Sequence, residues 1–281
     1  MISTICICGA GTMGSGIAQV CAQGGFDTML FDIDESVLEK AKQGIQKNLQ
    51  NLVNKEKISV REQEEIFNRI QFVKDINVCT ADLIIEAIIE NIEAKIDLLN
   101  KLARVNNPKV IFATNTSSLS VSQIQKESLH PENIIGMHFF NPAPVMKLVE
   151  VVKGNNTGEE TVQTVFDLCK RLGKTPVICK DAPGFIVNRV ARQYYLEAMK
   201  LIEDGIASFE NVDDIMEATG FKMGPFKLID LIGMDINLIV SETLYEAFNR
   251  TERFKPSPIQ IDKVKKGELG KKAGKGFYKY N

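Results

Sequence analysis

The segment MHFFNPAPVMKLVEV, residues 137–151, holds one of only two histidines in the chain. His138 lies in an apolar run, and Glu150 lies on the next strand-like run, after an NPAP turn. Histidine transfers protons near neutral pH, and antiparallel pairing of the two runs would let the Glu150 carboxylate reach one ring nitrogen and fix its tautomer. A buried structural histidine is the alternative, but the flanking Asn141 and the cofactor motif below favour catalysis. His130 lies in a loop-like segment, and no role is predicted for it.

A glycine-rich segment, GAGTMGSG, follows the first strand-like run and opens the first helical pattern. Gly9, Gly11 and Gly14 have the GxGxxG spacing, which permits a tight turn, close approach to a pyrophosphate and close packing of helix on strand. The helix N-terminus, with Thr12 and Met13, offers unpaired N–H groups to phosphates. A turn that only shapes the fold is the alternative. The strand–turn–helix context favours dinucleotide binding, and these five residues are predicted cofactor contacts.

Cofactor choice follows from the acids after the second strand-like run. Asp32 ends that run 18 residues after Gly14, where the motif has an acid about 20 residues on that hydrogen-bonds the adenosine ribose. NADP carries a phosphate on this ribose and would also meet Asp34 and Glu35. Because like charges repel, the sequence predicts NAD.

Two polar segments are further candidates. TNTSSLS, residues 114–120, follows an apolar run at the sheet edge where α/β folds bind ligands. Ser117 or Ser118 would present a hydroxyl there or cap a helix, and spacing leaves both readings open. DAPGFIVNRV, residues 181–190, puts Asn188 in the first turns of a helix. Its amide points into a site at a domain junction or lies on an exposed helix face, and the sequence alone leaves this open.

The order of patterns predicts the fold. Strand-like runs alternate with helical patterns in the first two-thirds of the chain, which predicts βαβ units and a largely parallel sheet. The strand-like runs are 2–8, 27–32, 81–88, 109–114, 133–140 and 146–152, and the helical patterns are 12–23, 36–53 and 92–105. Later patterns are helical, at 185–205, 210–219, 235–248 and 259–266. We therefore expect a Rossmann-type α/β dinucleotide-binding domain at residues 1–183 and a smaller all-helical domain at 184–281, which forms a wall of the substrate cleft.

Composition narrows the function classes. The 281 residues carry a net charge of −2, which gives no indication of nucleic acid or an anionic membrane as partner. No apolar run approaches the roughly 18 residues of a membrane-spanning helix, and no signal peptide is seen. The six cysteines form no CxxC pair. They predict thiols in a reducing cytoplasm, and no metal site is predicted.

Four stretches together resemble the L-3-hydroxyacyl-CoA dehydrogenase family, and within it the short, single-function 3-hydroxybutyryl-CoA dehydrogenase type. They are GAGTMGSGIAQV, EAIIENIEAK, NTSSLS with HFFNPAPVMKLVEV, and PGFIVNR. MGPFKLIDLIGMD and GKKAGKGFYKY are similar to the family's C-terminal domain. The resemblance covers essentially the whole chain.

The resemblance implies a role for each candidate residue. His138 matches the catalytic histidine, Glu150 matches its acidic partner, and Ser117 matches the serine that hydrogen-bonds the reacting oxygen, which selects it over Ser118. The remaining matches are the active-site Asn188, Asn141 of the HFFNP motif, the ribose-binding Asp32, Glu90 and Lys95 near the nicotinamide, and Asn115 among the cofactor contacts.

The implied reaction is reversible hydride transfer between NAD and a 3-hydroxyacyl-CoA, with acetoacetyl-CoA and 3-hydroxybutyryl-CoA as the expected pair and His138 as the proton carrier. The family also implies a homodimer through the helical domain. The absence of a fused hydratase sequence leads us to expect a stand-alone dehydrogenase. The sequence fixes neither the acyl-chain length nor the physiological direction.

Two alternatives compete with this reading. A dehydrogenase of the 3-hydroxyisobutyrate or 6-phosphogluconate type uses a lysine on the helix that enters the second domain. Here GFIVNRVARQYY offers Asn188 but no lysine. A non-enzymatic dinucleotide sensor on the same fold would not need His138, Glu150, Ser117 and Asn188 together.

Overall fold

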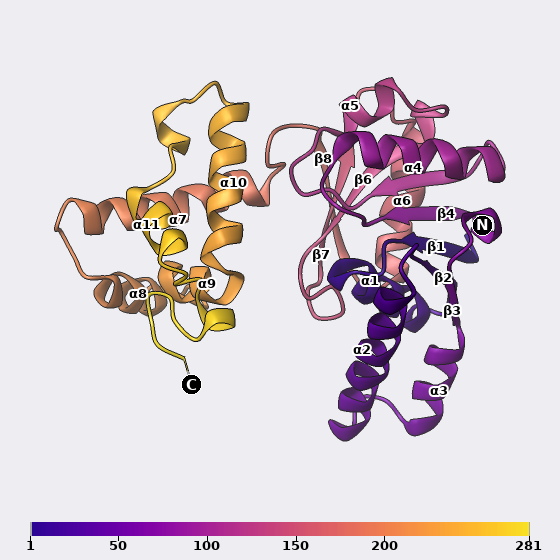
Figure 1. Cartoon of the computed structure of the whole chain (residues 1–281), viewed down its shortest axis with the longest axis horizontal. Coiled ribbons are helices and arrows are strands. Elements are labelled where there is room, and N and C mark those ends of the chain that lie inside the picture. The colour runs from indigo at the N-terminus through magenta and orange to yellow at the C-terminus, as the bar shows by residue number, and fades with distance from the viewer. Residues whose placement is uncertain (1, 281) are drawn as a thin grey trace. The chain divides into compact units, whose positions relative to one another are not determined.

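The computed structural model describes residues 2–280, and the chain forms two compact units that divide between Ala182 and Pro183 (Figure 1). The first unit is an α/β structure built on one sheet, and the second is helical. The predicted fold class is therefore confirmed.

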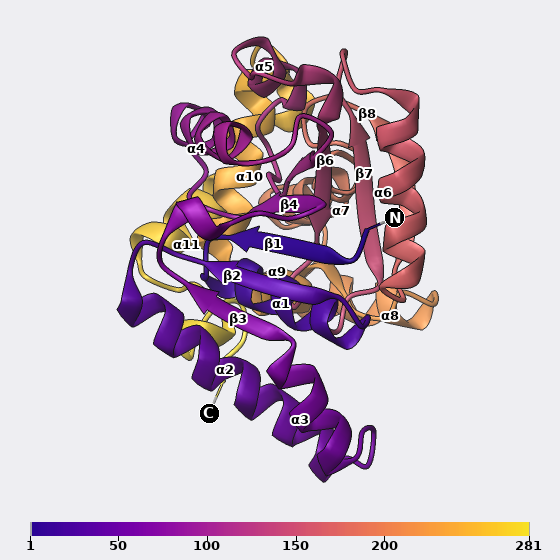
Figure 2. The ribbon, with the colours of Figure 1, turned by 90° about the vertical axis from the view of Figure 1, so that its right-hand side faces the viewer.

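One eight-stranded sheet forms the centre of the first unit. Its strand order is β3-β2-β1-β4-β5-β6-β7-β8. Neighbouring strands from β3 to β6 are parallel, β7 is antiparallel to β6, and β8 is parallel to β7. The strands are β1 (Thr4–Cys8), β2 (Asp27–Phe31), β3 (Ile70–Val73), β4 (Leu83–Glu86), β5 (Ile111–Thr114), β6 (Ile134–Phe139), β7 (Leu148–Lys153) and β8 (Thr175–Lys180). Figure 2 shows them fanning from β3 through β1 to β7, as the twist of a sheet requires.

Helices cover both faces of this sheet, with α4 and α5 on one side and α1 and α2 on the other (Figures 1 and 2). They are α1 (Thr12–Gln23), α2 (Glu35–Asn54), α3 (Val60–Asn68), α4 (Ile92–Val105), α5 (Val121–Lys126) and α6 (Glu159–Arg171), with short 3₁₀ turns at Ile76–Val78 and Pro131–Asn133. Because both faces are covered, strands such as β1 and β4 are apolar along nearly their whole length. Ile5 and Ile7 pack into the core shared with α1, α2 and α6.

The structure contains two strands that the sequence analysis did not predict. All six strand-like runs of the sequence contain strands, and α1 and α4 have the predicted bounds. The strands β3 and β8, at the two edges of the sheet, are additional. The helices α3, α5, α6 and α9 are also additional.

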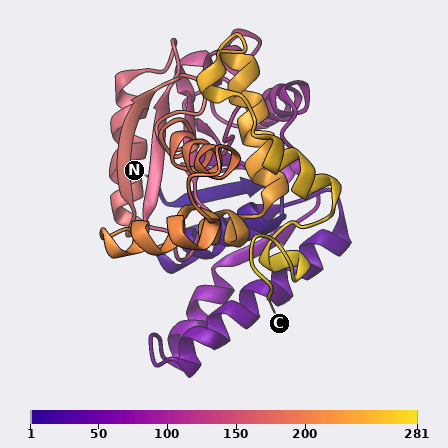
Figure 3. The same cartoon turned by 90° about the vertical axis from the view of Figure 1, so that its left-hand side faces the viewer.

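The second unit is a set of packed helices, coloured orange to yellow in Figure 3. They are α7 (Val187–Glu203), α8 (Phe209–Ala218), α9 (Pro225–Ile232), α10 (Met234–Ala247) and α11 (Pro258–Lys265), with 3₁₀ turns at Glu252–Phe254 and Lys271–Ala273. Their core includes Tyr195, Met199, Phe226, Ile229 and Met234.

The end of the chain is held against this helical unit by a buried aspartate. The Asp230 carboxylate accepts hydrogen bonds from the backbone N–H groups of Phe277 and Tyr278, both at 2.9 Å, and from the Tyr280 hydroxyl at 3.0 Å. A Cβ on Gly276 would lie 2.0 Å from Asp230 Oδ1, so only glycine permits this approach.

Two classes of feature are absent from residues 2–280. No helix there is long and apolar enough to cross a membrane. No group of three or more His, Cys, Asp or Glu side chains there could hold a metal ion.

Candidate active site

His138 and Glu150 face each other across the antiparallel pair β6 and β7. His138 Nδ1 lies 2.7 Å from Glu150 Oε2, and the two side chains are 7% and 1% exposed. Directly opposed residues on antiparallel strands point to the same face, so the pairing brings the two groups together. The Phe140 ring contacts the imidazole, with centroids 4.5 Å apart. A carboxylate on one ring nitrogen fixes the tautomer and the orientation of the ring.

Asn115 joins the ends of two neighbouring strands. It follows β5, and its Oδ1 accepts a hydrogen bond of 2.9 Å from the backbone N–H of Phe139, the residue after His138. The segment with Ser117 and Ser118 therefore starts beside the histidine strand. The Ser120 hydroxyl accepts the Gln123 N–H and caps α5, so neither of these two serines is the helix cap.

Glu90 and Lys95 support the same segment. Glu90 Oε1 accepts hydrogen bonds from the backbone N–H groups of Ser117 and Ser118 at 3.1 and 3.3 Å, and Glu90 Oε2 lies 3.2 Å from Lys95 Nζ. Burial acts to raise the pKa of Glu90, but Lys95 and hydrogen bonds from Thr116 and Ser117 outweigh it and hold that pKa below its ordinary value. Direct contact of these two residues with NAD stays a prediction.

The glycine-rich loop has the geometry of a phosphate cradle. Gly9 has φ +102°, and a Cβ there would lie 2.6 Å from Ala87 O, at the end of the neighbouring strand β4. A Cβ on Gly14 would lie 1.7 Å from Gly9 O, so this glycine allows α1 to pack on the loop. A Cβ on Gly11 meets nothing within 4 Å. Open space thus faces Gly11 at the start of α1, whose first residues are Thr12 and Met13.

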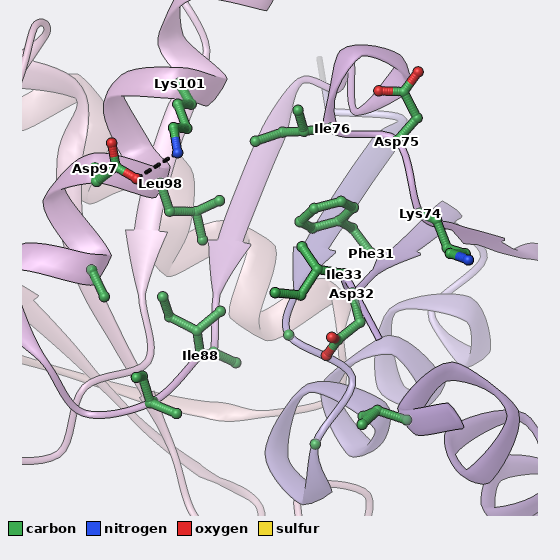
Figure 4. A pocket seen from close by; sticks show the side chains of 16 residues that line it. Phe31, Asp32, Ile33, Lys74, Asp75, Ile76, Ile88, Asp97, Leu98 and Lys101 are labelled. Carbon is green, nitrogen blue, oxygen red and sulfur yellow. Dashed lines mark ion pairs between the residues drawn. The ribbon is translucent and has the colours of Figure 1, made fainter. Parts of the chain in front are cut away.

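A pocket of about 690 Å³ extends from this loop (Figure 4). Apolar side chains such as Phe31, Ile33, Ile88 and Leu98 line it, as does Asp32. Asp32 Oδ2 accepts the Ala10 N–H at 2.8 Å and Oδ1 accepts the Asp34 N–H at 3.0 Å. Each carboxylate oxygen can accept a second hydrogen bond. The pocket lies at the switch point between β1 and β4, where doubly wound sheets bind dinucleotides, so its residues fit the adenosine half of NAD.

The remaining predicted site residues are Asn141 and Asn188. Asn141 is exposed and precedes a cis bond to Pro142. Asn188 belongs to the second unit, in the first turn of α7, after Gly184 at φ +71°. Their joining with His138 in one site stays a prediction.

Sequence reasoning missed Glu86, Thr114 and Thr116. All three are buried polar residues, and Glu86 Oε1 lies 2.6 Å from Lys95 Nζ. The available signal was the run LIIEAIIE, where Glu86 interrupts a strand that is otherwise apolar.

Comparison with known proteins identifies the family. The domain described as "3-hydroxyacyl-CoA dehydrogenase, NAD binding domain" matches residues 4–182, and "3-hydroxyacyl-CoA dehydrogenase, C-terminal domain" matches residues 184–280. The chain belongs to the 3-hydroxyacyl-CoA dehydrogenase family. By this membership it is an NAD-dependent dehydrogenase that acts on the CH–OH group of a 3-hydroxyacyl-CoA.

Three relatives of this dehydrogenase show how far the likeness extends. It is 44% identical over 279 residues to the 3-hydroxyadipyl-CoA dehydrogenase of Escherichia coli, covering 99% of this chain but 59% of that protein. It is 41% identical over 276 residues to a probable 3-hydroxybutyryl-CoA dehydrogenase of Deinococcus radiodurans, covering 98% and 99% of the two chains. The crystal structure of (S)-3-hydroxybutyryl-CoA dehydrogenase from Ralstonia eutropha matches with a TM-score of 0.95 at 37% identity, covering 100% of both chains.

Proposed function

We propose that this dehydrogenase interconverts (S)-3-hydroxybutyryl-CoA and acetoacetyl-CoA. The full-length likeness to the Deinococcus and Ralstonia proteins, both named for this substrate, supports the proposal. The Escherichia coli relative is named for a longer, acidic acyl chain, and this chain spans about three fifths of it. The acyl chain is therefore the point that the experiment must decide.

The observation that carries the chemistry is the buried contact of 2.7 Å between His138 and Glu150. In the proposed mechanism Glu150 holds Nδ1, and Nε2 removes the hydroxyl proton of the substrate during oxidation or returns it to the carbonyl oxygen during reduction. The Phe140 ring, whose centroid lies 4.5 Å from that of the imidazole, helps to keep water from it. Bound NAD supplies the hydride acceptor.

Ser117 and Asn188 complete the proposed catalytic set. The Ser117 hydroxyl and the Asn188 amide would donate hydrogen bonds to the oxygens that gain negative charge. The alternative class, which uses a lysine, finds little support on α7. The lysine of that helix is Lys200, which lies in the last turn and pairs with Asp204 at 2.9 Å.

The test is the loss of NADH absorbance with acetoacetyl-CoA, 3-oxohexanoyl-CoA and 3-oxoadipyl-CoA as substrates. We expect the highest kcat/KM with acetoacetyl-CoA. A higher kcat/KM with 3-oxoadipyl-CoA would refute the butyryl assignment and keep the family activity. No turnover with any of the three would refute the proposed function.

We further propose a homodimer through the helical unit. Large apolar side chains on α9 and α10 are exposed in the single chain, among them Leu231, Ile236 and Ile239. Sedimentation should therefore give twice the chain mass, and Ile239→Lys should shift it to the monomer. A monomeric unmodified protein would contradict this proposal.

We also propose a cytoplasmic location. The six cysteines are free thiols in the structure, which fits a reducing compartment. Fractionation of the source cells with an antibody against the chain checks this proposal.

A further inference from the structure

A buried arginine on α7 has no carboxylate beside it. Arg192 is 3% exposed, and within residues 2–280 no Asp or Glu side chain pairs with it. Burial lowers the pKa of Arg192 to about 10, so its guanidinium still carries a charge at neutral pH. Charged side chains are rarely buried without a partner, because an uncompensated buried charge is costly. Arg192 therefore calls for an explanation.

Every hydrogen bond that Arg192 makes within residues 2–280 comes from one nitrogen. Nη1 donates to the backbone oxygen of Asn237 at 2.7 Å, to Asn237 Oδ1 at 3.2 Å and to Ser241 Oγ at 2.9 Å. Gln260 Nε2 donates to the same two side-chain oxygens, at 2.5 and 3.0 Å. These acceptors are a carbonyl, an amide and a hydroxyl, so the network holds the guanidinium in place without neutralising it.

The other edge of the guanidinium has no acceptor in this part of the chain. Nε is buried and has no hydrogen-bond partner among residues 2–280, and Nη2 makes no hydrogen bond with them either. Nε and Nη2 lie side by side on the planar group, and two parallel donors of this kind match the two oxygens of a carboxylate. A carboxylate would thus supply both the missing charge and the missing acceptors.

The position of Arg192 on α7 relates it to Asn188. The two residues are four apart, so they lie on the same face of the helix, about 6 Å apart along its axis. Long side chains in a helix lean toward its N-terminus, which turns the Arg192 side chain toward the turn that carries Asn188. Three C–C bonds of an extended chain span roughly 4 Å. An acyl chain whose C3 oxygen meets the Asn188 amide would therefore bring a carboxylate at C6 close to Arg192.

We propose that Arg192 is a specificity-determining residue, which binds the terminal carboxylate of a six-carbon dicarboxylic acyl chain through Nε and Nη2. The dehydrogenase would then reduce 3-oxoadipyl-CoA as well as acetoacetyl-CoA, by the same hydride and proton transfer, since the carboxylate takes no part in bond making. A four-carbon chain ends before it reaches Arg192. The inference rests on the proposed place of Asn188 at the reacting oxygens.

The experiment compares two substrates that differ only at C6. 3-Oxoadipyl-CoA has a carboxylate there, whereas 3-oxohexanoyl-CoA has a methyl group. In the unmodified protein we expect kcat/KM to favour 3-oxoadipyl-CoA by roughly 10- to 100-fold, the range for a hydrogen bond to a charged group. In Arg192→Met this ratio should fall at least tenfold. Arg192→Lys should restore little of it, because an ammonium lacks the planar pair of donors.

The matched control is Lys200→Met, which removes a cation from an exposed position in the last turn of the same helix. It should leave the ratio of the two substrates unchanged. A binding measurement without turnover accompanies the kinetics: adipyl-CoA should bind the unmodified protein more tightly than hexanoyl-CoA in calorimetric titration. A structural role of Arg192 alone would affect both ligands alike.

Three results would overturn the inference. The first is a kcat/KM for 3-oxoadipyl-CoA no higher than that for 3-oxohexanoyl-CoA in the unmodified protein. The second is an unchanged ratio in Arg192→Met. The third is an Arg192→Met protein that sediments as a monomer with an unchanged ratio, which would assign the missing carboxylate to a second copy of the chain.

The inference and the proposed function can fail separately. If Arg192→Met does not fold, Arg192→Lys and the two Kd values of the unmodified protein decide the inference. An unmodified protein that turns over none of the 3-oxoacyl-CoA substrates would refute the proposed function, while equal binding of adipyl-CoA and hexanoyl-CoA would refute the inference. A higher kcat/KM with 3-oxoadipyl-CoA than with acetoacetyl-CoA would support the inference and replace the butyryl assignment.

Discussion

The carboxylate of Asp32 accepts a hydrogen bond of 2.8 Å from the backbone N–H of Ala10. One residue earlier on each segment, the N–H of Gly9 donates to the carbonyl oxygen of Phe31 at 2.8 Å. The glycine-rich loop is thus fixed to the end of β2 by two bonds, and Asp32, the predicted ribose-binding acid, is held at a set distance from the N–H groups that are predicted to face the phosphates.

Asp32→Ala should weaken NADH binding and narrow the preference for NADH over NADPH. Loss of a hydrogen bond to a charged group costs about 1.5–3 kcal/mol, which corresponds to a Kd for NADH about 10- to 100-fold higher. The binding of NADPH should weaken less than that of NADH, because the Asp32 carboxylate no longer repels the ribose phosphate of NADPH. Fluorescence titration with both cofactors measures this, and Asp27→Ala at the exposed start of β2 is the control. An unmodified protein that uses NADPH as efficiently as NADH would contradict the assignment.

His138→Ala should lower turnover by roughly 10² to 10⁴, the range for loss of a general acid–base group, with little change in NADH binding. Glu150→Gln keeps the size of the side chain and removes the charge beside Nδ1, so it should also lower turnover. In the double variant the two losses should not add, because the residues act as a pair. Steady-state kinetics of the four proteins gives the coupling. Additive losses in free energy would refute it.

Asn188→Ala tests whether the helical unit supplies a residue to the site. Removal of a donor to the reacting oxygen should lower kcat by about 10²- to 10³-fold. The Kd of NADH should stay the same, since the predicted cofactor contacts lie in the first unit. Asn211→Ala, at an exposed position of α8, is the matched control. Equal kcat in the two variants would remove Asn188 from the mechanism.

Asp230→Asn should destabilise the helical unit by about 2–4 kcal/mol, because the amide NH₂ would face N–H groups that the carboxylate now accepts. All five tyrosines lie between residues 194 and 280, and the chain has no tryptophan. Tyrosine fluorescence during urea unfolding therefore reports on this unit alone. Asp214→Asn removes only an exposed carboxylate 3.8 Å from Lys227 and should cost less than about 0.5 kcal/mol. Equal midpoints for the two variants would show that Asp230 does not hold the C-terminal segment.

Strands whose pattern is complete in the sequence were predictable, and edge strands were not. β3 has only four residues, one of them the exposed Gln71, and it follows the polar helix α3. β8 contains Pro176 and is half exposed. Both lie at an edge of the sheet and are defined by pairing with β2 and β7 rather than by their own periodicity.

The same distinction holds for the candidate site: contacts within one local segment were predictable from the sequence, and contacts between separate elements were not. The contact between His138 and Glu150 was predictable, because two neighbouring strand-like runs joined by a turn are expected to pair antiparallel. The bond from Asn115 to Phe139 spans 24 residues, and the contact of Lys95 with Glu86 joins a helix to the strand before it. Such contacts depend on how separate elements pack, so the sequence indicated the residues of the chemistry but not those that support them.

The antiparallel placement of β7 beside β6 has a consequence for biosynthesis. His138 and Glu150, the proposed acid–base pair, are only 12 residues apart, on strands that follow one another in the chain. Chains are synthesised from the N-terminus, and domains generally fold as units in that order. The segment from residue 134 to 153 is therefore synthesised before α7 to α11. The contact between His138 and Glu150 therefore lies wholly within the first unit, residues 1–182, and the helical unit is synthesised after both residues.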